Sequence, residues 1–94
     1  MQVLLAALCL LQHPRAERPD VRAGLDTLYG GGFPAAAAYF AELAGRDSTD
    51  PAPVTFEASA YIWWAAALEN DAYEAARIDS LLDLAIARDR KSVV

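Results

Sequence analysis

Residues 58–68 read ASAYIWWAAAL, and Ser59 is the only position in this stretch that is not apolar. A helix with this sequence carries apolar side chains on every side, so it must be buried on several sides at once. The stretch therefore predicts the central helix of the fold. The prolines before this stretch place the start of the helix near Pro51 or Pro53, and the end of the apolar stretch places its end at about Glu69.

Proline and glycine divide the chain before this helix into two further helical segments. Pro19 suits the first turn of a helix, where its missing N–H leaves no bond unmade, and the glycines at positions 30–32 end that segment. Pro34 begins a second segment, and Gly45 ends it. No run alternates between polar and apolar residues as a strand would.

A fourth helix is predicted after the central one. Asp71 and Glu74 have capping-box-like spacing at its start, and Glu74 and Arg77 are placed for a weak surface ion pair. Its apolar positions recur at helical spacing, at Tyr73, Ala76, Ile78, Leu81, Leu82, Ala85 and Ile86. The sequence thus predicts an all-α fold with two antiparallel helix pairs between about Pro19 and Arg90.

Composition restricts the class of protein. The 94 residues are 55% hydrophobic and carry a formal net charge of -5, which indicates one folded domain and argues against nucleic acid as a partner. The single cysteine excludes a disulfide framework within the chain, and the single histidine leaves too few ligands for most zinc sites. We expect no metal and no cofactor.

The N-terminal segment, residues 1–16, resembles a secretory signal peptide. Residues 3–11 read VLLAALCLL, which is too short to span a membrane, and Ala16 is a small residue near a cleavage point. The prediction is a folded domain over residues 17–94 that is periplasmic or secreted if the leader is functional, and cytoplasmic otherwise. The alternative is an N-terminal apolar helix packed on the domain. No stable membrane span is expected.

The second and fourth segments begin with related phrases 40 residues apart. The phrases are GGFPAA at positions 31–36 and DAYEAA at positions 71–76, each with an aromatic residue followed three positions later by alanine. This pattern resembles the tetratricopeptide repeat family, whose units are antiparallel helix pairs of about 34 residues. The resemblance covers roughly Pro19 to Arg88 and is degenerate, because Asp20 stands where the family usually has tryptophan.

The resemblance implies a tetratricopeptide-like helical array, with a four-helix bundle as the alternative. It also implies that certain small and aromatic residues pack at the contacts between helices. In this chain these repeat-packing positions are Gly31, Phe33, Ala36, Phe40, Tyr73 and Ala76. Ala36 and Ala76 are expected at close helix–helix contacts.

The aromatic residues of the central helix are the candidates for binding a partner. Trp63 lies on a different helical face from Trp64, so the two side chains cannot serve one contact. We expect Trp64 in the core, and an exposed aromatic surface around Phe56 and Trp63. That surface would bind a protein or peptide partner, or a second copy of the chain in a homodimer.

Catalytic chemistry has little support in the sequence. The serines have no base nearby once His13 is removed with the leader, and the glycines at 30–32 lack the lysine of a phosphate-binding loop. Asp79 and Asp83 are most simply a solvated helix face. The chain is therefore interpreted as a non-enzymatic protein–protein interaction module, an exported adaptor or scaffold. The alternatives are a structural subunit that self-associates or a fragment of a longer repeat protein.

Overall fold

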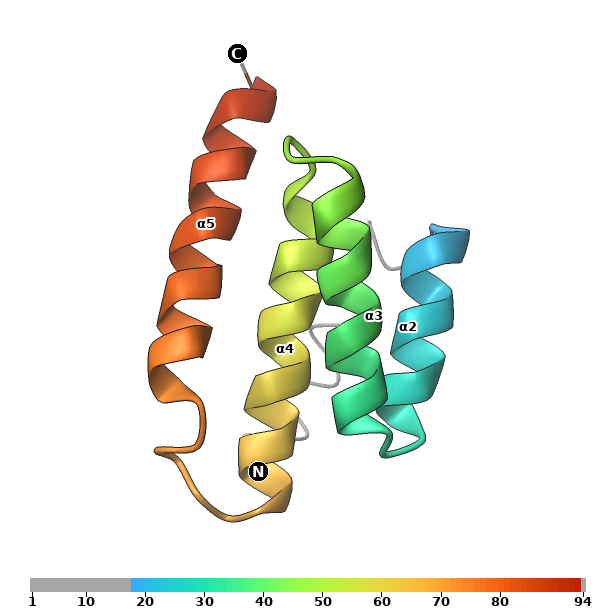
Figure 1. The fold of residues 1–94 in the computed structure, drawn as a ribbon, viewed down its shortest axis with the longest axis vertical. Coiled ribbons are helices and arrows are strands. Elements are labelled where there is room, and N and C mark those ends of the chain that lie inside the picture. Colours follow the sequence, from blue (N-terminus) through green and yellow to red (C-terminus); the bar gives the residue numbers. More distant parts are fainter. Residues whose placement is uncertain (1–17, 94) are drawn as a thin grey trace.

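The computed structural model describes residues 18–93, which form four α-helices and no strand. Successive helices run in opposite directions (Figure 1), which confirms the predicted all-α fold of antiparallel helix pairs. The predicted leader, residues 1–16, lies outside the described residues. The helices are α2 (Pro19–Tyr29), α3 (Phe33–Arg46), α4 (Pro51–Ala67) and α5 (Ala75–Val93).

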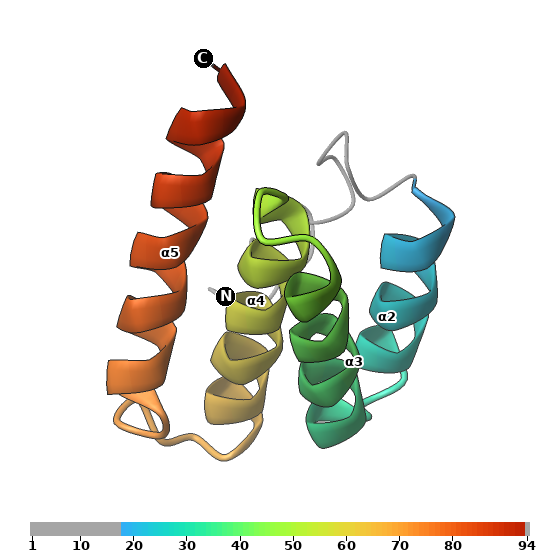
Figure 2. The same ribbon diagram turned by 45° about the horizontal axis from the view of Figure 1, so that its top comes forward.

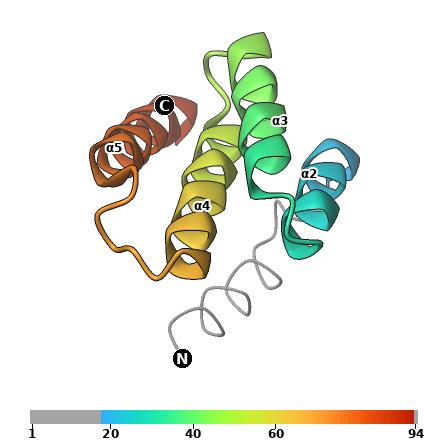
Figure 3. The same ribbon diagram turned by 60° about the horizontal axis from the view of Figure 1, so that its bottom comes forward.

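Helix α4 is the central element, as its apolar sequence predicts. It packs against α2, α3 and α5, whereas α5 packs mainly against α4. Helices α2 and α5 lie at opposite edges of the fold (Figure 3) and make no comparable contact with each other. The described helices therefore form an open succession. A closed four-helix bundle would bring its first and last helices together.

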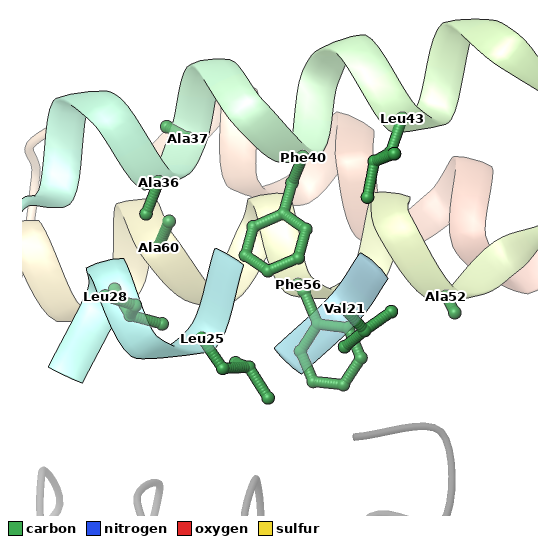
Figure 4. Packing of buried hydrophobic residues seen from close by; sticks show 10 residues of the cluster. All are labelled: Val21, Leu25, Leu28, Ala36, Ala37, Phe40, Leu43, Ala52, Phe56 and Ala60. Atoms are coloured by element: carbon green, nitrogen blue, oxygen red, sulfur yellow. The ribbon is translucent and has the colours of Figure 1, made fainter. Parts of the chain in front are cut away.

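The main core lies between α2, α3 and α4. Leu25 and Leu28 of α2 meet Phe40 of α3 and Phe56 of α4, and all four side chains are buried (Figure 4). The rings of Phe40 and Phe56 lie 5.6 Å apart. Ala60 of α4 belongs to the same cluster, and its small side chain lies beside α3 (Figure 4).

Gly24 marks the closest approach between α2 and α3. A Cβ at this position would overlap the Phe40 ring and would lie 2.7 Å from Cδ1 of Tyr39. The Tyr39 hydroxyl also donates a 2.7 Å hydrogen bond to the backbone carbonyl of Asp20. Glycine in mid-helix usually lowers helix stability, but here it lets two aromatic residues lie against the α2 backbone.

The connection between α3 and α4 is held by side chains from both edges of the fold. Asp50 caps α4 by accepting a hydrogen bond from the Ala52 N–H, and its carboxylate also pairs with Arg18 at 2.8 Å. From the other edge, Nη1 of Arg88 on α5 donates to the carbonyls of Ala44, Asp47 and Asp50 at 3.0–3.2 Å. Figure 2 shows the C-terminal part of α5 on the same side of the fold as this loop.

The start of the fourth helix was predicted too early. Residues 70–74 form turns, in which the Asn70 side chain accepts a hydrogen bond from the Ala72 N–H and the Asn70 carbonyl accepts one from Tyr73. Glu74 then has a φ of 54°, in the left-handed region, so the helix begins only at Ala75. Asparagine favours such local turns over a helical start.

Candidate interaction surface

Phe56 does not belong to an exposed surface, contrary to the sequence-based prediction. Its side chain is fully buried in the main core, where its ring meets that of Phe40. The reason is geometric: α4 turns the face that carries Phe56 toward both α2 and α3. A helix with one continuous polar face would have revealed this orientation, but the apolar stretch of α4 has no such face.

Trp63 lies at the boundary between the core and the surface. It is half-buried, packs against the main core, and its ring centroid lies 5.6 Å from that of Tyr29. Tyr29, at the end of α2, is 38% exposed, and partial burial raises the pKa of its hydroxyl. The Trp63 Nε1–H is shielded from solvent and has no hydrogen-bond acceptor among residues 18–93. We call these two residues the Tyr29–Trp63 pair.

Trp64 is half-buried as well, in a second aromatic cluster. Its ring stacks on Tyr61 with centroids 6.1 Å apart and planes 10° apart, and it lies 5.1 Å from the ring of Tyr73. Tyr73 comes from the turn before α5, so this cluster joins α4 to the α4–α5 connection. The expected division, with Trp64 in the core and Trp63 outside, is therefore wrong: Trp63 is the tryptophan that packs on the main core.

Arg77 completes the second aromatic cluster. Its Nη1 donates to the Tyr61 hydroxyl at 3.1 Å, its guanidinium carbon lies 5.3 Å from the Tyr61 ring centroid, and its Nε pairs with Glu74 at 2.6 Å. The hydrogen bond to Tyr61 is the main reason why the pKa of Arg77 is raised. The predicted Glu74–Arg77 ion pair is confirmed. These groups bind one another, so the cluster connects α4 to α5.

Glu57, on α4, is the one buried charged residue in the described part of the chain. Burial raises the pKa of its carboxyl group, and the positive charge of Arg77 opposes that effect. Because a buried carboxylate is costly in its charged form, this residue reduces stability at neutral pH. The effect identifies Glu57 as a group to test by titration.

The six predicted repeat-packing residues have different surroundings in the two halves of the chain. In the first half, Ala36 and Phe40 are fully buried and Phe33 is half-buried, whereas Gly31 is exposed in a turn with a φ of 86°. In the second half, Tyr73 is half-buried and precedes its helix. Ala76 is exposed, and so its expected close helix contact is not formed.

The difference between the two halves has a physical cause. Phe33 is the first residue of α3, whereas Tyr73 lies two residues before the first residue of α5. Equivalent positions of the two phrases therefore fall on different faces of α3 and α5. As a result, Ala76 points away from α4. Ala85, one of the predicted apolar positions, is buried instead.

Sequence analysis did not identify α5 as an exposed apolar edge. Leu82 and Ile86 were predicted as part of one apolar face with Ala85, but they are 39% and 53% exposed, and Leu84 is 43% exposed. The sequence contained an indication of this exposure. The apolar side chains of α5 cover more of the helix circumference than one neighbouring helix can bury, at positions Leu81, Leu82, Ala85 and Ile86.

The described residues offer neither a metal site nor a membrane span. Within residues 18–93, no group of three or more histidine, cysteine, aspartate or glutamate side chains is placed to hold a metal ion. None of the helices in that range combines the length and the hydrophobicity needed to cross a bilayer. Cys9 and His13 lie outside the described residues.

Comparisons with known proteins leave the chain without an assigned family. No family model, curated protein or solved structure matches it. Functional inference therefore rests on the geometry of the two aromatic clusters and of α5.

Proposed function

We propose that the protein is a non-enzymatic protein-binding module with a tetratricopeptide-like arrangement of helices. The open succession of antiparallel helices supports this proposal, because each pair packs on the next without closing into a bundle. The echo between positions 31–36 and 71–76 supports it as well, although only the first copy places its alanine at a buried contact.

The observation that carries the proposal is the Tyr29–Trp63 pair. Tyrosine and tryptophan supply most of the binding energy in many protein interfaces, because they offer a large apolar area with one polar atom. Here they are in contact across α2 and α4, and each keeps part of its surface open to solvent. In the second aromatic cluster, by contrast, the Tyr61 hydroxyl already has a hydrogen-bond partner within the fold.

The partner expected at this surface is a protein segment with one large apolar side chain. The chain carries a net charge of -5, but Tyr29 and Trp63 are uncharged, so the contact would be mainly apolar. An exported adaptor or scaffold fits this role if residues 1–16 act as a leader.

The proposal can be tested with a library of displayed random peptides selected on the purified chain. Recovered peptides should carry an apolar anchor, and Tyr29→Ala should weaken their binding at least about tenfold, which corresponds to the loss of a hot-spot contact. The matched control is Tyr73→Ala, because Tyr73 also contacts a tryptophan but belongs to the second aromatic cluster.

The outcomes of this test separate two readings of the surface. Equal binding to wild type and Tyr29→Ala would contradict the assignment of the Tyr29–Trp63 pair. Weaker binding after Tyr73→Ala alone would move the binding surface to the second aromatic cluster. Circular dichroism of both variants would verify that each remains helical, so that a loss of binding reflects the surface.

A further inference from the structure

Helix α5 has two apolar faces, and only one of them is covered. Toward α4, Ala85 is buried and Leu81 packs beside it against Val54. Leu82 and Ile86 lie one turn apart on another face, with 39% and 53% of their surface exposed. Among the described helices, none but α4 packs extensively on α5 (Figure 1).

Two opposite charges flank this exposed pair of side chains. At 100° per residue, Asp79 lies about one turn before Leu82 on the same side of α5, and Arg90 lies about one turn after Ile86. Both are exposed, and neither forms an ion pair with another described residue. We call Asp79, Leu82, Ile86 and Arg90 the α5 stripe. Its order is acid, apolar, apolar, base. Asp83 is exposed beside the stripe, between the levels of Leu82 and Ile86.

We propose that the α5 stripe is a homodimer contact in which α5 pairs with α5 of a second copy in antiparallel orientation. A two-fold axis near the level of Leu84 would place Leu82 opposite Ile86 of the second copy. The same axis would bring Asp79 close to Arg90 of the second copy. Because the symmetry repeats every contact, one stripe supplies two apolar pairs and two ion pairs.

The charges at the two ends of the stripe favour the antiparallel orientation of a second copy. A parallel pairing of two copies would place Asp79 beside Asp79 and Arg90 beside Arg90, and like charges at such positions are unfavourable. The antiparallel pairing places opposite charges together at both ends. The four residues of the stripe are thus complementary to themselves when reversed, and the one like-charge approach in this pairing is between the two copies of Asp83 near the axis.

The size of the stripe sets the expected strength of the contact. Helix α5 has 19 residues, which is about 28 Å, and contributes two large exposed apolar side chains from each copy. This is less than the burial of about 1,200–2,000 Å² that is typical of stable complexes. We therefore expect a reversible dimer with a dissociation constant of roughly 10–500 µM. The stripe lies away from the Tyr29–Trp63 pair and does not depend on the proposed function.

The test is sedimentation velocity on the full 94-residue chain from about 10 µM to about 1 mM, under reducing conditions because Cys9 could cross-link copies. Wild type should shift from monomer to dimer over this range. Leu82→Asp and Ile86→Asp should each lower the association constant at least about tenfold. The matched control is Leu84→Asp, since Leu84 is equally exposed on the opposite side of α5 and should leave association unchanged.

A charge exchange tests the antiparallel geometry itself. Asp79→Arg and Arg90→Asp should each weaken association roughly threefold per broken pair, and the double variant should restore it. A chain that stays monomeric at every concentration would overturn the proposal. So would a dimer that Leu82→Asp and Ile86→Asp leave intact, or one that the double charge exchange fails to restore. Helical circular dichroism would verify that each variant is folded.

Discussion

Glu69 occupies, in the C-terminal cap of α4, the position that Gly31 occupies in the cap of α2. Each residue directly follows the C-cap residue of its helix. Each has a left-handed backbone conformation, with a φ of 52° for Glu69 and 86° for Gly31. Each donates its N–H to the carbonyl three residues back, and the following N–H bonds the carbonyl five residues before it, at 3.0–3.1 Å. The two caps share one hydrogen-bond pattern, but only glycine adopts it without steric strain.

This relationship predicts that Glu69→Gly stabilises the protein. Removing the Cβ relieves left-handed strain of about 1 kcal/mol, although glycine also adds entropy to the unfolded chain. Urea denaturation should show a higher midpoint for Glu69→Gly and a lower one for Gly31→Ala, with each change in unfolding free energy about 1 kcal/mol or less. A lower midpoint for Glu69→Gly would show that its side chain contributes more than the strain costs.

Gly24→Ala should destabilise the fold by about 1–3 kcal/mol, because the new methyl group meets the Phe40 and Tyr39 rings. The matched control is Gly45→Ala. Gly45 also lies within a helix, but beyond its chain neighbours and the backbone of its own turn no atom lies within 4 Å of its hypothetical Cβ, so alanine should stabilise by up to about 1 kcal/mol. Thermal denaturation of both variants would measure the difference. Equal effects would contradict close contact at Gly24.

Ala36→Leu and Ala76→Leu should differ, although the two alanines occupy equivalent positions in the sequence echo. Ala36 is fully buried, so extra volume should cost about 1–3 kcal/mol, whereas Ala76 is exposed and should tolerate leucine within about 0.5 kcal/mol. Denaturant titration of each variant is the measurement. A large cost at Ala76 would contradict its exposed position at the start of α5.

Glu57→Gln should stabilise the protein at pH 7, and the gain should disappear toward pH 4.5. Burial raises the pKa of the Glu57 carboxyl above its ordinary value of 4.5, so the folded state holds a proton more readily than the unfolded state. The cost of the charged form is therefore complete above the raised pKa and is removed as the pH falls through it. Unfolding free energies of both proteins across this range would reveal the convergence.

The same titration separates Glu57 from the carboxylate of Asp20. A hydrogen bond from Arg18 lowers the pKa of Asp20 below its ordinary value of 3.8, so its contribution is complete above that pH and is lost only below it. A constant difference between wild type and Glu57→Gln from pH 7 to pH 4.5 would contradict the raised pKa of Glu57.

The export signal is tested by expressing the chain with its native start. If residues 1–16 are a leader, N-terminal sequencing should find a mature protein that begins near Glu17. Cell fractionation would then place that form outside the cytoplasm. Recovery of an intact cytosolic chain that begins at Met1 would contradict the signal peptide.

The sequence was a reliable guide wherever a local signal was strong. Pro19, Pro51 and the glycines at 30–32 each lie at a helix boundary as expected, because proline and glycine act on the backbone of their own turn. The central position of α4 followed from its apolar circumference. These features depend on few residues, and no distant contact changes them.

Rotation of the helices was harder to predict. Phe56 and Trp63 were assigned to one exposed surface, because an all-apolar helix contains no polar face to show which side meets solvent. The start of α5 was placed too early because the left-handed φ of Glu74 opposes the usual preference of glutamate. That error of a few residues changed the face assigned to Ala76.

The hydrogen bonds of Arg88 have a consequence for how the fold opens. In an array of stacked helices, the terminal helix is expected to fray independently of its distant neighbours. Here Arg88 of α5 holds carbonyls at the end of α3 and in the following loop, 38–44 residues earlier in the chain. Detaching α5 would leave those carbonyls without this donor, so amide hydrogen exchange at the α3–α4 loop should report the unfolding of α5. Loop amides that exchange together with those of α5 would show that the edge helix and the first pair open as one cooperative unit.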